Sequence, residues 1–381
     1  MRRAVLALFA VLAVAPACAP QAEPAPQHAM PFQFVLERQI VFPITIDGKP
    51  AEAWLDSGAG AIVVDAAFAR QLGLELGAPI KAHGVSGEVA DVRLSKADLV
   101  AGDLAMPGRR VVVMDLSPVQ RLVGRPVQVL LGRDVFDQAV VQIDFEGRRL
   151  ALLPREGFAA PPGAALPLKR SGDLKSLPLK VAGVEMPAIL DLGNAGGLLI
   201  DREFAAHYGL LDGRKASTTL GVGADGAHEE TQTTVDRLEL GGLSLNGVPT
   251  TATANLSSKA PANIGLQVLS RFSLTIDFAG DRIWLSPYPD AKSRPFRKNR
   301  AGLSLAPENG RLVVDHVAQG SPAERGGWKI GEAIVAIDGK PAPSGFAAVE
   351  ASFFVYGAPG TSVALTLAGG TTRTLTLADY Y

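Results

Sequence analysis

Short runs of alternating apolar and polar residues dominate the chain from about residue 36 onward and predict a fold built mainly of β-strands. Residues 41–46 predict a strand that turns at Asp47-Gly48 into a hairpin partner at residues 51–55. Residues 66–72 predict a short helix that ends at Gly73. Further strands are expected at residues 62–64, 111–114, 127–131 and 139–144.

The same pattern occurs a second time along the chain. Ala188-Ile189-Leu190-Asp191 stands 135 positions after Ala53-Trp54-Leu55-Asp56. Similarity at a nearly fixed distance, continued through the segments that follow, is the signature of a duplicated structural unit. We therefore expect two tandem β-units, at residues 36–155 and 166–288, joined by a linker rich in Pro, Gly and Ala.

The composition agrees with a β-rich protein of several domains. The 381 residues are 47% hydrophobic and 20% charged, which is enough apolar surface for packed cores. They include 41 Gly and 27 Pro, which suits many short strands and turns. The formal net charge of -1 gives no electrostatic footprint for a nucleic-acid partner.

The N-terminus has the layout of a secretory signal peptide. Arg2 and Arg3 precede an apolar run at residues 4–15, and small residues follow it. We therefore expect a signal peptide at residues 1–19 and a mature protein outside the cytoplasm, in the periplasm or cell envelope. Cys18, the only cysteine, resembles the lipidated cysteine of a bacterial lipoprotein, which would anchor the protein to a membrane. The alternative is ordinary signal cleavage, which leaves a soluble protein.

An acidic turn follows a buried strand in the first unit. Apolar residues 53–55 run directly into Asp56-Ser57-Gly58, which is a costly place for a carboxylate with only a structural role. Residues 129–131 form a later apolar run that ends at Gly132. These motifs resemble the retropepsin-like aspartic peptidase family, whose lobes carry Asp-Ser/Thr-Gly and a later apolar-apolar-Gly. The resemblance implies a mainly β protein with two acid-protease β-barrel lobes fused in one chain.

The second unit keeps part of this pattern and departs from it at two positions. Asp191-Leu192-Gly193-Asn194 retains the aspartate and the first glycine, and Gly265 supplies the second. Leu192 stands where the family has Ser or Thr, so half of the hydroxyl network between the two turns cannot form as usual. Asn194 is a candidate to compensate for the missing hydroxyl, and Asn263 interrupts the apolar run before Gly265.

A pair of carboxyl groups gives this arrangement its chemistry. Two neighbouring carboxyl groups share one proton, because ionising both costs too much free energy. The ionised member takes a proton from water, which attacks a peptide carbonyl, and the protonated member donates to the carbonyl oxygen. We expect Asp56 and Asp191 to form this catalytic pair and to act on a peptide or protein substrate. The residues expected to support the two turns are Ser57, Gly58, Gly193, Asn194, Gly132 and Gly265.

Two glycine-rich loops stand at similar positions in the two units. The resemblance implies that they are flaps that close over an extended peptide, and the alternative is that each is a plain hairpin tip. The expected flap residues are Gly84, Val85, Ser86 and Gly87 in the first unit and Gly221, Val222 and Gly223 in the second.

Other catalytic schemes find little support in the sequence. The five histidines, at positions 28, 83, 207, 228 and 316, include no pair at metal-ligand spacing. No Gly-x-Ser-x-Gly elbow stands out. We therefore expect neither a metal nor a cofactor.

The pattern changes in the last part of the chain, residues 300–381. Gly320-Ser321-Pro322-Ala323, followed by glycines and an apolar strand, resembles the PDZ domains of bacterial exported proteases. A helix at about residues 344–354 and strands at residues 363–367 and 373–377 complete the expected module. The resemblance implies that the C-terminal end of a peptide ligand adds as a strand beside Gly302, Leu303, Ser304 and Leu305. The alternative is a module that only packs against the lobes.

A basic linker, residues 287–300, precedes this module. It carries Arg294, Arg297, Lys298 and Arg300, and we expect this cluster to form a solvated face.

Three interpretations of the whole chain follow from these motifs. The first is an aspartic-type endopeptidase that acts on extended chains outside the cytoplasm, with a PDZ module that binds substrate or regulates access. The second is a non-catalytic peptide-binding protein derived from such an enzyme, for which Leu192 is the argument. The third is a peptidase that is active only as a dimer, through the first unit of each chain.

Overall fold

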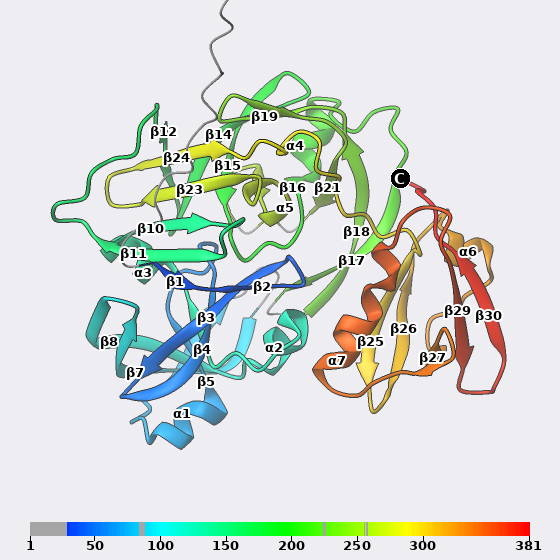
Figure 1. Ribbon diagram of the computed structural model, residues 1–381, viewed down its shortest axis with the longest axis horizontal. Helices are drawn as coiled ribbons and strands as arrows, with labels where there is room; N and C mark the ends of the chain where they lie inside the picture. The colour runs from blue at the N-terminus through cyan, green and yellow to red at the C-terminus, as the bar shows by residue number, and fades with distance from the viewer. Residues whose placement is uncertain (1–28, 84–87, 224–225, 255, 257) are drawn as a thin grey trace, which may run out of the picture.

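The computed structural model describes residues 29–83, 88–223, 226–254, 256 and 258–381. The expected signal peptide with Cys18, and the expected flap residues Gly84 to Gly87, lie outside the described residues. Two β-lobes lie side by side, and a smaller module from the C-terminal part of the chain stands at one end of the pair (Figure 1). This arrangement agrees with the mainly β fold and the duplication that the sequence predicts.

The first lobe is built on one sheet with a short helix on each of three connections. Its strand order is β2-β3-β4-β9-β5-β8-β7-β6. The strands are β2 (Gln33–Val35), β3 (Gln39–Ile46), β4 (Lys49–Leu55), β5 (Val63–Asp65), β6 (Pro79–His83), β7 (Glu88–Ala101), β8 (Leu104–Met114) and β9 (Val129–Leu131), and the helices are α1 (Ala66–Leu72), α2 (Ser117–Val123) and α3 (Arg133–Gln138).

The second lobe repeats this architecture. Its strand order is β17-β18-β21-β16-β22-β15-β14-β19-β20, and β13 pairs with β14. The strands are β13 (Lys169–Ser171), β14 (Leu174–Val181), β15 (Val184–Leu190), β16 (Leu198–Asp201), β17 (Ser217–Gly223), β18 (Gly226–Val235), β19 (Leu238–Leu240), β20 (Leu243–Leu245), β21 (Val248–Thr253) and β22 (Ala262–Ile264), and the helices are α4 (Arg202–His207) and α5 (Leu266–Leu269).

The same local signals start the equivalent helices of the two lobes. The Asp65 side chain accepts a hydrogen bond from the N–H of Phe68 at 3.1 Å and so caps α1. Asp201 caps α4 through the N–H of Phe204 at 2.8 Å. Helix α1 ends at Gly73, whose φ of 75° suits a residue without a Cβ. The predicted helix at residues 66–72 therefore matches α1 at both ends.

A third sheet joins the two lobes. Its order is β1 (Met30–Pro31), β11 (Arg149–Pro154), β10 (Ala139–Asp144), β23 (Phe272–Asp277), β24 (Arg282–Pro287) and β12 (Leu166–Pro167). Strand β10 of the first lobe pairs with β23 of the second, and Ile143 lies opposite Leu274. Beside this sheet the rings of Phe136 and Phe278 stack at 4.9 Å. One continuous apolar core therefore spans both lobes and fixes their relative position.

Strands β1 and β2 precede residue 36, at which the first unit is expected to begin. Strand β1 pairs with β11, and β2 pairs with β3. The first lobe therefore uses upstream residues that the duplicated pattern does not include.

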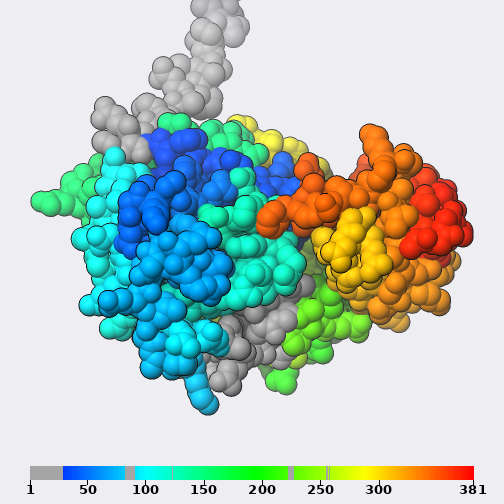
Figure 2. All heavy atoms as spheres, turned by 90° about the horizontal axis from the view of Figure 1, so that it is seen from below, coloured from blue at the N-terminus to red at the C-terminus, as the bar shows by residue number. Residues whose placement is uncertain are grey.

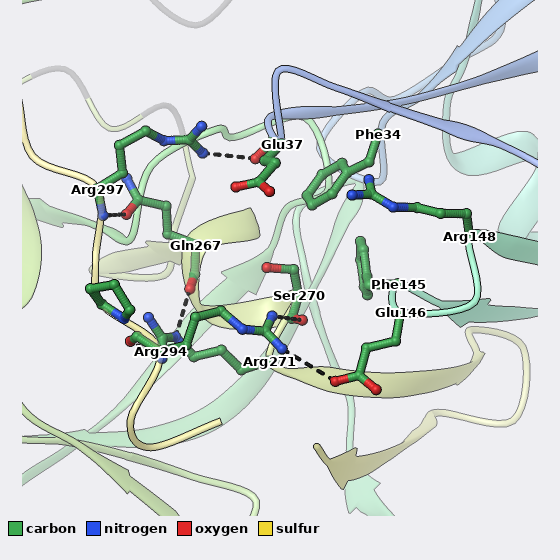
Figure 3. A pocket seen from close by; sticks show the side chains of 11 residues that line it. Phe34, Glu37, Phe145, Glu146, Arg148, Gln267, Ser270, Arg271, Arg294 and Arg297 are labelled. Atoms are coloured by element: carbon green, nitrogen blue, oxygen red, sulfur yellow. Dashed lines mark hydrogen bonds and ion pairs between the residues drawn. The ribbon is translucent and has the colours of Figure 1, made fainter. Parts of the chain in front are cut away.

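The basic linker is docked against both lobes and does not form the expected solvated face. Arg297 donates to the backbone carbonyls of Leu36 at 2.6 Å and Glu37 at 2.8 Å. Arg294 pairs with Asp290 at 2.7 Å, and also contacts Glu146 in the turn between β10 and β11. Figure 3 shows Arg294 and Arg297 with Glu37 and Glu146 around a cavity between the N-terminal strands and the end of α5. The volume of this cavity is about 260 Å³. Neither Asp56 nor Asp191 lines this cavity, so we assign it to the lobe junction.

The C-terminal module is a separate small β-structure with its own apolar core around Leu303, Trp328 and Leu365. Its strand order is β25-β26-β27-β29-β30, and β28 pairs with β27. The elements are β25 (Leu303–Glu308), β26 (Arg311–Val317), α6 (Pro322–Arg325), β27 (Ala333–Ile337), β28 (Lys340–Pro341), α7 (Phe346–Ala351), the 3₁₀ helix η1 (Ser352–Tyr356), β29 (Ser362–Leu367) and β30 (Thr372–Thr376).

The C-terminal module touches both lobes, as the space-filling view illustrates (Figure 2). Toward the second lobe, Ser217 of β17 donates to the carbonyl of Gln319 at 2.5 Å, and the Thr218 hydroxyl lies 3.0 Å from Nε2 of His316. Toward the first lobe, α7 contacts α2, and the Arg38 guanidinium lies 5.4 Å from the Phe353 ring centroid. The described helices are too short or too polar to span a membrane.

Candidate active site

Parallel strand pairs carry the two acidic turns to the same place in each lobe. Strand β4 runs parallel to β9, and the Asp56 N–H donates to the carbonyl of Leu131 at 3.0 Å. Strand β15 runs parallel to β22, and the Asp191 N–H donates to the carbonyl of Ile264 at 3.2 Å. Each aspartate therefore directly follows a buried strand, and the hydrogen bond to the neighbouring parallel strand fixes the position of its backbone.

The two aspartates meet across the boundary between the lobes. The Asp56 carboxyl group is hydrogen-bonded to that of Asp191. Both residues are half-buried, so the pair lies at the surface of the core and not inside it. The structure thus brings together the two residues that the sequence predicts as the catalytic pair.

Glycine is required at the third position of each turn because the opposite carboxyl group occupies the space of a side chain. A Cβ on Gly58 would lie 2.5 Å from Oδ1 of Asp191. A Cβ on Gly193 would lie 2.3 Å from the carboxyl carbon of Asp56. Real Cβ atoms do not approach so closely, so any other residue at either position would push the two aspartates apart.

Backbone donors orient both carboxyl groups. Oδ1 of Asp56 accepts from the Gly58 N–H at 2.8 Å. Oδ1 of Asp191 accepts from the Gly193 N–H at 2.8 Å and from the Asn194 N–H at 3.1 Å. Each turn therefore folds back on its own carboxylate, which holds the side chain pointing at the other lobe.

Burial raises the pKa of Asp56 well above the usual range of a carboxyl group, and the negative charge of Asp191 raises it further. The two backbone hydrogen bonds to Asp56 oppose these effects but do not cancel them. A pair of carboxyl groups in contact holds one proton under conditions in which isolated aspartates are ionised. The pair therefore offers both an acid and a base.

One hydroxyl group links the two turns. The buried Ser57 Oγ donates to the carbonyl of Leu190 at 2.7 Å and accepts from the Leu192 N–H at 2.9 Å. The Leu192 side chain is fully buried in the apolar core and makes no reciprocal bond. The expected loss of half of this network is therefore seen, and the other half bridges the lobes.

The sequence makes Asn194 a candidate to replace the hydroxyl that Leu192 lacks, but the Asn194 side chain does not take this role. Its amide nitrogen donates to Oδ1 of Asn263 at 2.8 Å, and its Oδ1 accepts from the Gly196 N–H at 2.7 Å. These contacts lie within the second lobe. The position of Leu192 is therefore filled by packing, and Asn194 has another role.

Asn263 contacts the acidic pair, which the sequence analysis did not anticipate. Its amide nitrogen donates to Oδ2 of Asp191 at 2.6 Å. The sequence signal was present, because Asn263 is a polar residue at the point where the first lobe has Leu130 in the equivalent strand. From the sequence alone, this asparagine indicates only an interruption of the apolar motif before Gly265.

The glycines that end the apolar motifs make room for the acidic loops. A Cβ on Gly132 would lie 2.3 Å from the carbonyl oxygen of Ala61. A Cβ on Gly265 would lie 2.5 Å from the carbonyl oxygen of Gly196 and 2.7 Å from the side chain of Asn194. Both glycines therefore support the active-site turns by allowing close backbone packing.

The expected flap residues of the second lobe lie near the end of a long hairpin. Gly221, Val222 and Gly223 belong to β17, which pairs with β18 up to Gly226. In the first lobe the equivalent pair of strands is β6 and β7, in which His83 pairs with Glu88, and the expected flap residues 84–87 lie outside the described residues.

The residues expected to bind a peptide in the C-terminal module lie at the start of β25, which is the first strand of its sheet. Leu303 is buried, whereas Ser304 and Leu305 are half-buried. Gly302 has a φ of 78°, and its N–H donates to Oδ1 of Asn299 at 2.8 Å. The N–H of Gly302 is therefore already paired with the Asn299 side chain.

No group of three or more His, Cys, Asp or Glu side chains in the described part of the chain is arranged to hold a metal ion.

Comparison with family models finds a match in each of the two lobes. Residues 42–135 and 177–268 each match the family model described as aspartyl protease. No curated protein matches the sequence of the chain. Among solved structures, the crystal structure of Basic 7S globulin from soybean matches with a TM-score of 0.41 and 10% identity, over 69% of this chain and 95% of that chain. The double family match confirms the prediction of two tandem protease lobes in a mainly β protein.

We expect Ser57→Ala to destabilise the lobe junction, because it leaves the buried Leu190 carbonyl and Leu192 N–H without their partner. One buried polar group without a partner costs about 1–3 kcal/mol. We expect the free energy of unfolding to fall by about 2 kcal/mol. Denaturant unfolding monitored by tryptophan fluorescence measures it. Ser293→Ala, at an exposed serine, is the matched control and should change stability by less than about 0.5 kcal/mol. Equal effects of the two variants would contradict the bridging role of Ser57.

The raised pKa of Asp56 predicts how stability depends on pH. A carboxyl group with a raised pKa in the folded state binds its proton more tightly there than in the unfolded chain. Its contribution is therefore fully present below the ordinary aspartate pKa of about 3.9 and is lost as the pH rises through the raised value. An asparagine side chain cannot ionise, so Asp56→Asn should not lose stability in this way as the pH rises. The free energy of unfolding of the variant minus that of the unmodified protein should therefore increase from about pH 4 upward. Parallel unfolding midpoints for the two proteins across this range would rule out the raised pKa.

Proposed function

We propose that the chain is an aspartic endopeptidase that cleaves extended peptides or unfolded proteins. The observation that carries this proposal is the contact between the carboxyl groups of Asp56 and Asp191, one from each lobe. The aspartyl protease match in each lobe supports it, since the matched residues include both aspartates.

The proposed reaction uses the pair as acid and base in turn. The ionised carboxylate takes a proton from water, the water oxygen attacks the peptide carbonyl carbon, and the other carboxyl group gives its proton to the carbonyl oxygen. The C–N bond of the resulting tetrahedral intermediate then breaks. The first carboxyl group returns its proton to the amide nitrogen, and a hydroxyl of the intermediate returns a proton to the second. One water is consumed, and the pair ends with one proton, as it began.

Two observations favour this proposal over the alternatives. Leu192 lacks the hydroxyl of the family, but its N–H still bonds to Ser57, so the two turns are linked. This weakens the case for a non-catalytic peptide-binding protein. The dimer hypothesis requires a second copy to supply the other aspartate, whereas Asp191 of the same chain already contacts Asp56.

We also propose that the protein is exported to the periplasm or cell envelope. The support is the basic and apolar segment at residues 1–19, with Cys18 as the candidate for lipidation.

We propose that the C-terminal module is PDZ-like and binds the C-terminal end of a peptide. Strand β25 lies at the end of its sheet, α7 contacts it, and the Phe346 side chain at the start of α7 is 37% exposed. These features suit the addition of a peptide strand between β25 and the helix.

The same module is suited to influence the second lobe. Ser304 of β25 pairs with His316 of β26, and the His316 ring contacts Thr218 in the β17–β18 hairpin. A ligand beside β25 would therefore lie next to β26, and β26 contacts the hairpin that carries Gly221 to Gly223. This arrangement supports a role of the module in substrate delivery or regulation.

Replacing either aspartate should abolish cleavage. Asp56→Asn and Asp191→Asn each remove one acid–base partner, which is worth about 10²–10⁴-fold in kcat. The measurement is the rate of cleavage of an unfolded, fluorescently labelled protein, with Asp91→Asn at an exposed site as the control. Cleavage that survives Asp191→Asn but not Asp56→Asn would support the dimer. Cleavage that survives both substitutions would refute the carboxyl pair. An unmodified protein that binds the substrate without cleaving it would support the binding protein.

The peptide-binding role of the C-terminal module predicts a requirement for a free carboxylate. In an array of immobilised peptides, sequences that bind should lose at least about tenfold in affinity when their C-terminus is amidated. Leu305→Asp should weaken binding similarly, because it places a charge beside the added strand, whereas Ile330→Asp at a 68% exposed position should not. Peptides that bind equally well with an amidated end would leave the module with only its packing role.

A further inference from the structure

We propose that Asn263 and Asn194 form an amide relay that keeps Asp191 as the ionised member of the pair, so that Asp191 acts as the base and Asp56 carries the proton. The inference rests on the proposed peptidase function for its catalytic meaning. It assigns two positioning residues to the site: Asn194, which the sequence predicts as support for its turn, and Asn263, which the sequence shows only as an interruption of the apolar motif.

The direction of the relay is fixed by a backbone group. The Gly196 N–H can only donate, so the Asn194 atom that lies 2.7 Å from it must be the side-chain oxygen. The Asn194 amide nitrogen then faces Asn263, which must present its own oxygen at 2.8 Å. The Asn263 amide nitrogen is left to face Asp191.

The end of the relay is a hydrogen bond to the carboxylate. The Asn263 amide nitrogen donates to Oδ2 of Asp191 at 2.6 Å. Turning either amide around would place two donors or two acceptors against each other, so the chain of bonds has one polarity. A donor aimed at a carboxyl oxygen favours its ionised form.

The first lobe has no equivalent of this relay. Leu130 lies in β9 opposite Trp54, in the register at which Asn263 lies in β22 opposite Ile189. Leu130 is apolar and has no hydrogen to donate. The equivalent of Asn194 is Ala59, whose side chain is likewise apolar.

The two carboxyl groups therefore receive different sets of donors. Asp191 accepts from two backbone N–H groups and from the Asn263 amide. Asp56 accepts from the backbone N–H groups of Gly58 and Ala59, and no side-chain amide of the described residues donates to it. Burial raises the pKa of Asp56, and the neighbouring negative charge of Asp191 raises it further. The larger number of donors to Asp191 is the observation from which we assign the proton to Asp56.

Packing around Gly265 holds the relay rigid. The Asn194 carbonyl accepts from the Leu266 N–H at 2.8 Å, and the Gly265 N–H donates to the Gly197 carbonyl at 2.9 Å. Because a Cβ on Gly265 would lie 2.7 Å from the Asn194 side chain, glycine at this position leaves the space that Asn194 occupies. The relay therefore depends on the same glycine that supports the active-site turn.

The test replaces Asn263 by the residue that the first lobe has. In Asn263→Leu the first ionisation of the carboxyl pair should move up by about one pH unit, since a hydrogen bond to a charged group is lost. The primary readout is an NMR titration of ¹³Cγ-labelled aspartates, with the two signals assigned by Asp56→Asn and Asp191→Asn. In the unmodified protein the step at lower pH should appear on the Asp191 carbon. Asn194→Ala, which leaves Asn263 in place but unanchored, should give a smaller shift in the same direction.

Kinetics supply the second readout and separate this inference from the proposed function. The acid limb of the pH profile for kcat on a fluorogenic peptide should shift upward in Asn263→Leu, with kcat about tenfold lower at the optimum of the unmodified protein and little change in KM. Asn246→Ala, at an exposed asparagine, is the control. A lower-pH step on Asp56, or a titration unchanged by Asn263→Leu, overturns the relay even where the enzyme cleaves normally. Absence of cleavage in the unmodified protein contradicts the proposed function but leaves the titration to judge the relay.

Discussion

The close approach of two carboxyl groups across a domain boundary is the constraint on which the rest of this structure depends. Side chains that repel each other when ionised must be held together by the fold, and the fold does so through the backbone. Gly58 and Gly193 remove the atoms that would keep the aspartates apart. Ser57 ties the two turns together, and the shared sheet and core fix the lobes behind them. Because the two lobes cannot move apart, the two carboxyl groups stay in contact although their charges repel each other.

Duplication supplies a symmetric backbone, and the side chains then break the symmetry. The strand pairings around Asp56 and Asp191 are equivalent, but Leu192 replaces a hydroxyl and Asn263 replaces an apolar residue. Both substitutions lie in the second lobe and affect the same carboxyl pair. The first removes one link between the lobes, and the second adds a donor to Asp191. In a pair that shares one proton, such an inequality favours one of the two possible positions of the proton.

The parts of this architecture that were predictable are those specified by local or repeated signals. The strand before Asp56 and the helix at residues 66–72 follow from periodicity and capping. The pairing of the two aspartates follows from the duplication together with the resemblance to the retropepsin-like family. The role of Asn263 did not follow, because a polar residue in an apolar motif indicates a departure but not its contact partner. The docking of Arg297 on residues 36 and 37 was also missed, since it joins segments some 260 positions apart and depends on tertiary packing.

The sheet of the second lobe connects the C-terminal module with the relay beside Asp191. His316 of the module contacts β17, and the strand order continues through β18, β21 and β16 to β22, which carries Asn263. The equivalent sheet of the first lobe ends in β6. The contacts of the module with the first lobe lie elsewhere, at α2 and Arg38. The strands from β17 to β22 therefore form a hydrogen-bonded connection between the module and the part of the second lobe that carries Asn263. The second lobe thus carries both the residues that make the two carboxyl groups unequal and the sheet that His316 of the module contacts.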